Sequence, residues 1–374
     1  MRTRPGATIA VGAALALAAA TPAFAAAGTS PAPSSTAVGP VLNSVQAGTR
    51  LYIGGSFTQV DSTAQAGLAA LDAATGVRDP AFKADVQGKV YALATDGTTI
   101  YVAGSFTSIG GVARTNLAAV TPSGQVVSSF HPNVSSTVES LDYANGALYI
   151  GGAFTSVNGV KRKHLAALDP STGAVVPSFN PSANSLVHVV KASGSQVYVG
   201  GKFTAIGGVA RSYVALLDAS GAVQAYDPRL AFDSQVFDIA PTAGGVYLGT
   251  GGHLPAGNSV YATTVGTGAQ RWQVKTDGNV QTVETLGSDI YGGGHFNNTC
   301  LSGSTASTGC LVDFSSRKTV VVDDGTGAAR PFATFNSAFG VWDLTAAGGN
   351  LYALGEFTKV NTTSQPGIAR FPTP

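Results

Sequence analysis

The chain has 374 residues, of which only 11% are charged, and its formal net charge at pH 7 is +1. This balance, without a basic stripe, argues against nucleic acid and against an anionic membrane surface as partners. Small residues, among them 48 glycines, take the place of charged surface residues, and this composition favours a secreted protein.

The first 25 residues have the pattern of a secretory signal peptide. Arg2 and Arg4 supply a positive start, and the apolar run at residues 7–20 is too short to span a bilayer. Ala23-Phe24-Ala25 matches the small-residue cleavage site of such signals. We therefore expect a secreted, extracellular protein without a membrane anchor, whose mature chain begins near Ala26.

A repeated pattern begins at residue 40 and continues to the C-terminus. Each copy opens with a valine in a short apolar run, and a tyrosine follows eleven residues later in a second run that ends in small residues. The valines are Val41, Val90, Val138, Val187, Val236, Val280 and Val341, and the tyrosines are Tyr52, Tyr101, Tyr149, Tyr198, Tyr247, Tyr291 and Tyr352. A turn such as Asp96-Gly97 between two such runs is a strong hairpin signal.

Two further runs complete each copy, and the last of them ends in an aromatic residue in several copies. A unit of four short strands in about 49 residues is typical of a β-propeller blade. Consecutive apolar residues in the first two strands indicate burial on both faces, as between neighbouring blades. We therefore expect an all-β fold, a seven-bladed β-propeller of four-stranded antiparallel blades, over residues 40–374.

The two ends of the chain are expected to close the ring together. The seventh copy supplies only three strands, and the chain stops at Pro374 before a fourth. A segment rich in proline and serine, residues 26–39, precedes the first copy and is the candidate closing strand, within residues 29–36. Proline is poor strand material and is tolerated only at an edge.

Copies one to four follow the pattern closely, and three of their loops carry a basic residue after a Gly-Val turn. These residues are Arg114, Arg162 with its neighbour Lys161, and Arg211. We expect them to be solvated tips of hairpins.

The motif Tyr-(Ile/Val)-Gly-Gly-x-Phe-Thr, followed by Leu-Ala-x-(Leu/Val) and Ser-Phe-(Asn/His)-Pro, resembles the bacterial delta-60 repeat. This is a β-propeller repeat of secreted proteins. The similarity is strongest over residues 51–230, returns at 351–370 and is degraded at 247–340. The resemblance implies a propeller, and it implies no activity because the family offers no agreed catalytic residues to carry over.

Copies five and six depart from the pattern. Copy six is lengthened by a loop at residues 297–309, and Cys300 and Cys310 are the two cysteines of the chain. In an exported protein we expect them to form a disulfide, and a metal site is not expected from two cysteines alone. A kelch-like copper oxidase is disfavoured, because its Cys–Tyr cross-link needs a free cysteine.

No catalytic motif is present, and the sequence does not name a cofactor. Function on a propeller is therefore argued from the axial funnel, where the innermost strands converge. The second and third residues of those strands vary between copies and include polar and aromatic side chains. The candidate binding residues at these positions are Tyr91, Glu139, His188, Asp238, Trp342 and Asp343. A second candidate is the rim at copies five and six, where His253 and His295 end second strands.

Two interpretations of these residues stay open. In one they surround a ligand, and in the other they only hydrogen-bond neighbouring blades and channel water. On the first, we expect a monomeric binding or interaction module for extracellular carbohydrate, cell-surface material or protein. The alternative is a polysaccharide hydrolase or lyase with Glu139, His188 and Asp343 as acid–base candidates; a glycosidase needs two carboxylates within roughly 5–10 Å.

Overall fold

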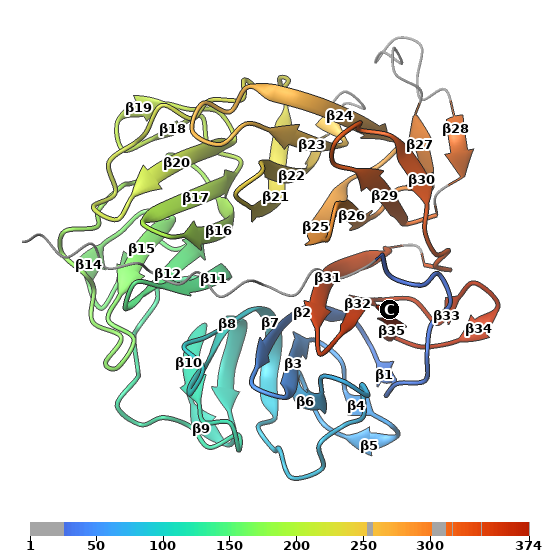
Figure 1. Cartoon of the computed structure of the whole chain (residues 1–374). Coiled ribbons are helices and arrows are strands. Elements are labelled where there is room, and N and C mark those ends of the chain that lie inside the picture. The colour runs from blue at the N-terminus through green and yellow to red at the C-terminus, as the bar shows by residue number, and fades with distance from the viewer. Residues whose placement is uncertain (1–25, 253–256, 301–311, 316, 338, 374) are drawn as a thin grey trace, which may run out of the picture.

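The computed structural model describes residues 26–252, 257–300, 312–315, 317–337 and 339–373 (Figure 1). The predicted signal peptide, His253 and Cys310 lie outside these residues, so the structure does not address the leader, that histidine or the Cys300–Cys310 pairing. The named elements of the described residues are all β-strands. Within the described ranges, no helix is long and apolar enough to cross a membrane.

Seven antiparallel sheets surround one axis, and their innermost strands encircle the centre of the view in Figure 1. These sheets are consistent with the seven blades predicted from the repeat. In chain order the three inner strands of the blades are β2 (Val41–Ala47), β3 (Arg50–Gly55), β6 (Leu68–Asp72); β7 (Val86–Thr95), β8 (Ile100–Ile109), β10 (Leu117–Val120); β11 (Val138–Ala144), β12 (Ala147–Gly152), β15 (Leu165–Leu168); β16 (Val187–Ser193), β17 (Gln196–Gly201), β20 (Val214–Asp218); β21 (Ser234–Pro241), β22 (Val246–Gly252), β23 (Ser259–Thr263); β25 (Val280–Leu286), β26 (Asp289–Gly294), β29 (Thr319–Asp323); and β31 (Val341–Ala347), β32 (Asn350–Gly355), β35 (Ile368–Pro372).

The predicted fourth strand is regular only in blades five and six, as β24 (Gln270–Thr276) and β30 (Ala329–Pro331). In blades one to four it shrinks to one antiparallel bridge, for example Leu168 with Val175. The chain then bends inward, because the aromatic residue that ends this run packs edge-on against the repeat tyrosine. Phe179 lies 5.2 Å from Tyr149 between ring centroids, at an interplanar angle of 70°.

Short strands lie outside the blades. They are β1 (Ala37–Val38), β4 (Gln59–Val60), β5 (Thr63–Ala64), β9 (Val112–Ala113), β13 (Ser156–Val157), β14 (Val160–Lys161), β18 (Ala205–Ile206), β19 (Val209–Ala210), β27 (Asn298–Cys300), β28 (Val312–Ser315), β33 (Lys359–Val360) and β34 (Thr363–Ser364). Most of them pair as small hairpins, whereas β27 and β28 extend the sheet of blade five.

The hydrophobic core lies between blades, as the doubly apolar strands predict. One cluster joins Tyr101 of blade two with Leu141 and Ile150 of blade three. Glycine is required at the end of the second strand because the next blade's repeat valine lies against it. A Cβ atom at Gly54 would meet Val90 Cγ1 at 2.5 Å, and one at Gly151 would meet Val187 Cγ1 at 2.6 Å.

The N-terminal segment lies along the seventh blade and reaches the first. Ala32 donates its N–H to the carbonyl of Arg370 in β35 at 2.8 Å and forms one antiparallel bridge there. Further along, β1 pairs with β4 of blade one, beside the C-terminal strands in Figure 1. Pro31 and Pro33 flank Ala32 and have no N–H, so a regular strand does not form.

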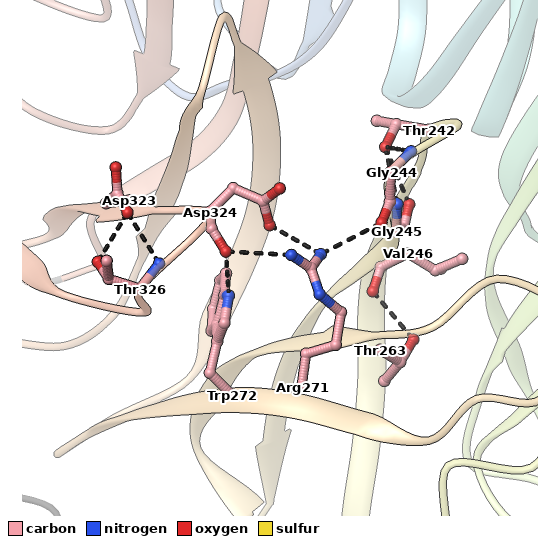
Figure 2. Close-up of polar contacts among 10 residues, drawn as sticks. All are labelled: Thr242, Gly244, Gly245, Val246, Thr263, Arg271, Trp272, Asp323, Asp324 and Thr326. Carbon is pink, nitrogen blue, oxygen red and sulfur yellow. Dashed lines mark hydrogen bonds and ion pairs between the residues drawn. The ribbon is translucent and has the colours of Figure 1, made fainter.

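The junction of blades five and six is held by side chains of β24, on the turn side of the sheets (Figure 2). Arg271 pairs with the carboxylate of Asp324 at 2.8 Å and donates to the carbonyl of Gly244 at 3.3 Å. Trp272 donates Nε1–H to the carbonyl of Asp324 at 2.8 Å. The degraded repeat of these blades therefore keeps an interblade contact of its own.

The arginines expected at solvated hairpin tips lie back against their blades instead. Arg162 is only 6% exposed, and its guanidinium donates to the carbonyls of Lys161 at 3.0 Å and Pro177 at 3.4 Å. Arg211 makes the same contact with Gln224 at 3.3 Å. The long side chain covers apolar surface while its head satisfies carbonyls where the fourth strand is short.

Arg162→Ala is expected to lower the free energy of unfolding by about 1–2 kcal/mol, because buried carbonyls lose their donors. Urea denaturation followed by tryptophan fluorescence measures this loss. The neighbouring Lys161 is exposed, so Lys161→Ala serves as the control and should change stability by less than about 0.5 kcal/mol. Equal effects of the two substitutions would contradict a bracing role for Arg162.

Candidate functional site

A β-bulge recurs at the start of the innermost strand in all seven blades. The register shifts between the first and third residues, for instance between Val138 and Ser140 and between Val341 and Asp343. A bulge leaves the extra residue out of the ladder and redirects its side chain. The second residues therefore turn towards the axis; they are Leu42, Tyr91, Glu139, His188, Phe237, Gln281 and Trp342.

These side chains line a cavity of about 940 Å³ at one mouth of the axis, which we call the funnel. All seven blades contribute to its wall. Residues outside the bulge form its upper part, and they include Lys89, Lys202, His295, Phe339 and Glu356. The funnel thus brings together four predicted residues of the axial set with His295 of the predicted rim set.

Glu139 and His188 form a polar pair on one side of the funnel. The carboxylate Oε2 lies 2.7 Å from imidazole Nδ1, and the two side chains are 27% and 13% exposed, respectively. The ring of His188 also lies against Phe237, at 5.0 Å between centroids. Its Nε2 atom is buried and has no hydrogen-bond partner among the described residues.

An aromatic group from blades six and seven forms another side. The ring of His295 meets Trp342 at 4.9 Å and 79°, and Phe339 at 5.9 Å, both edge-to-face. Burial lowers the pKa of His295, and the positive charge of Lys318 lowers it further. Within the described chain, neither His295 Nε2 nor Trp342 Nε1 has a hydrogen-bond partner, and both atoms are buried.

The third residues of the innermost strands join neighbouring blades. Asp238 Oδ2 accepts from the N–H of Val283 at 3.0 Å. Asp343 Oδ2 accepts from the hydroxyl of Ser44 at 2.5 Å, and this bond links blade seven to blade one. Asn43, Ser140 and Thr282 accept in the same way from the fourth residue of the next blade. Asp238 and Asp343 thus line the channel below the funnel and are engaged between blades, as the second sequence interpretation has it.

Below the funnel, a channel of about 490 Å³ holds a charge cluster that the sequence reasoning missed. Lys191 lies among four carboxylates, Asp142, Asp238, Glu284 and Asp343. Lys191, Asp142 and Glu284 each stand fifth in their innermost strand, where Val45, Ala94 and Ala240 stand in other blades. Charged residues in so apolar a strand were the available signal.

The cluster shifts the protonation of its members. Burial raises the pKa of Glu284 to about 7 and that of Asp343 to about 7, and it also raises the pKa of Asp142 and Asp238. Burial lowers the pKa of Lys191, but attraction to the carboxylates outweighs it, and the pKa stands above its ordinary value. Lys191 therefore remains the internal counter-charge. In the part of the chain that the structure describes, no group of three or more His, Cys, Asp or Glu is placed to hold a metal ion.

A family model described as "Domain of unknown function (DUF5122) beta-propeller" matches residues 95–130 and 196–223. Among proteins with curated descriptions, none matches the sequence significantly. The WD40 β-propeller domain of Doa1 is similar in structure, with a TM-score of 0.58 and 12% identity over 91% of this chain and 96% of that one. The extracellular domain of the putative one-component system BT4673 from B. thetaiotaomicron gives a TM-score of 0.47 and 13% identity, over 93% and 40%. The fold is a β-propeller, and the matched model supports a bacterial-type β-propeller family for this chain.

Proposed function

We propose that this protein is a secreted, monomeric binding module of the delta-60 type that holds an extracellular glycan in its funnel. One observation carries the proposal. The bulged position, which is the least repetitive in the repeat, gathers aromatic faces and polar groups at one mouth of the axis. Tyr91, Phe237 and Trp342 offer faces for the apolar side of a sugar, and Glu139 and Gln281 offer hydrogen bonds to its hydroxyls.

The remaining features agree with an extracellular setting. The pattern of residues 1–25 supports export, and export supports the Cys300–Cys310 disulfide, which is part of this proposal. The low charge of the chain favours a neutral ligand over a charged polymer. An extracellular protein is the other partner class, and the experiment below separates the two.

Trp342→Ala is expected to weaken glycan binding by about tenfold, which corresponds to ~1.4 kcal/mol. The substitution removes a flat face and one N–H from the funnel wall. Affinity electrophoresis in gels that contain xylan, mannan, soluble chitin or soluble cellulose derivatives measures the effect. Thermal unfolding of the variant should match the wild type, because Trp342 lies in the funnel and not between blades.

Phe232→Ala is the control for this prediction. Phe232 is 84% exposed, precedes the innermost strand of blade five and is not part of the funnel wall. Its removal should leave retention unchanged. Retention of the wild type by no glycan, together with capture of a defined cell-surface protein, would replace the glycan with a protein partner.

A polysaccharide lyase or hydrolase is the second candidate, and the Glu139–His188 contact favours it. A carboxylate that accepts from Nδ1–H leaves Nε2 as a base directed at the ligand, as general acid–base catalysis requires. Glu356 is a further carboxyl group in the same wall. If the purified protein shortens one of the polymers, and Glu139→Gln and His188→Ala abolish this turnover, the protein is an enzyme and the binding-module proposal is wrong.

A further inference from the structure

We infer that the funnel binds the end of a glycan chain, inserted along the propeller axis, and reads a hydroxyl group of the terminal sugar between His188 and Trp342. The inference rests on the proposed function and adds the mode of recognition to it. It follows from the wall of the funnel, from its floor and from the polar atoms that are buried in it.

The wall is continuous around the axis. Blades one to seven contribute, in order, Ser56, Lys89, Glu139, Lys202, Gln235, His295 and Glu356. A polymer that runs across a surface needs a groove that is open at two sides, whereas this cavity is bounded on every side. An internal sugar of a long chain can only rest on the rim, where Phe339 is 52% exposed. A chain end can enter.

The floor stops the chain from passing through. Below the funnel the cavity narrows to the channel that holds Lys191 and four carboxylates. Two of these carboxylates, Asp238 and Asp343, are also engaged in bonds between blades. A neutral sugar in this channel would strip water from the charges without compensating them. The terminal sugar therefore stays in the funnel above the cluster.

The buried polar atoms of the wall require a group that both accepts and donates. Trp342 Nε1–H can only donate. When His188 donates Nδ1–H to Glu139, the Nε2 atom of its neutral ring can only accept. Both atoms are buried without a partner among the described residues, and a buried polar group without a partner is unfavourable. A sugar hydroxyl satisfies either kind of atom, whereas a carboxylate can only accept.

A homologous oligosaccharide series tests the mode of binding. The probes are the xylo-, manno-, chito- or cello-oligosaccharides that correspond to the polymer retained by the wild type, from one to six sugars, titrated by calorimetry. We expect the affinity per chain to reach a plateau by about two sugars. Partial cleavage of the polymer at constant mass should raise the number of binding sites in proportion to the new ends.

Chemical blocking then locates the end. Loss of binding after borohydride reduction assigns the reducing end, and loss after modification of the other end assigns the non-reducing end; either result supports the inference. Unchanged binding after both ends are blocked, or an affinity that grows with each added sugar, would overturn it while leaving the proposed function intact. Absence of binding to every polymer and oligosaccharide would overturn the proposed function as well.

Two substitutions test the reading of the hydroxyl. Trp342→Phe keeps an aromatic face and removes the N–H, and Glu139→Gln removes the carboxylate that fixes the tautomer of His188. Each should weaken binding of the oligosaccharide several-fold and should discriminate less between the sugar and an analogue that lacks the recognised hydroxyl. Wild-type discrimination in both variants would contradict the assigned donor and acceptor.

Discussion

Lys191→Met should lower the free energy of unfolding at pH 8 by about 2–3 kcal/mol, a value reduced from that of a fully buried pair because the channel admits water. Lys191 is the one cation of the axial cluster, and it faces Asp142, Asp238, Glu284 and Asp343 from four other blades. Methionine keeps the length of the side chain and removes the charge. The carboxylates then repel one another without a counter-charge, and they cannot leave because several bond the next blade.

The loss should depend on pH with a definite sign. The pKa of Glu284 rises from its ordinary 4.5 to about 7, and that of Asp343 from 3.8 to about 7. A raised folded-state pKa means that the protonated carboxyl group stabilises the fold below its ordinary pKa, and that this stabilisation is lost as the pH rises through about 7. At pH 5 these groups carry protons and repel little, so the effect of Lys191→Met should be small there and should grow towards pH 8.

Chemical denaturation of wild type and variant at both pH values measures this difference. Lys202→Met is the matched control, because Lys202 lies in the same blade but is exposed at the upper wall of the funnel. Its removal should change stability by less than about 0.5 kcal/mol at either pH. A loss for Lys191→Met that is the same at pH 5 and pH 8 would refute the role of the cluster.

Deletion of residues 27–38 should lower the midpoint of thermal unfolding by about 5–10 °C. Besides the Ala32 bond, Gly28 donates to the carbonyl of Pro372 at 3.2 Å, and Ser35 donates its hydroxyl to Asp61 of blade one at 2.5 Å. Ala37 is 3% exposed, within the cluster that joins blades one and seven. The deletion therefore removes the contacts that span the closure and leaves β35 as an unpaired edge.

A chain that begins at Gly39 should show this loss, compared with a control chain that begins at Ala26. The single substitution Ala32→Pro removes only the N–H that bonds Arg370, and it should give a smaller shift in the same direction. Differential scanning calorimetry measures all three chains. Equal midpoints for the two chain lengths would show that the blades close without this segment.

The hydrophobic pattern of the sequence was sufficient to predict the blades. Each repeat valine packs against a glycine of the previous blade, as Val90 does against Gly54, so spacing and composition carry the constraint along the chain. The fourth strand was predicted less well. Its run is regular only where β24 and β30 form, because elsewhere the terminal aromatic bends inward against the repeat tyrosine. Likewise, the burial of Arg162 depends on carbonyls of a strand fifteen residues away and has no local signal.

For the candidate site, the sequence by itself determined which positions vary between copies, and so it named Tyr91, Glu139, His188 and Trp342. It could not separate the second from the third residue of the innermost strand, because that distinction arises from a bulge, which is a property of strand pairing. The tertiary structure alone decided that the second residues line the funnel, that Asp238 and Asp343 join blades, and that His295 meets Trp342. It also decided that Lys191, drawn from one blade, neutralises carboxylates from four others, since Coulomb attraction acts through space between residues that the sequence holds far apart.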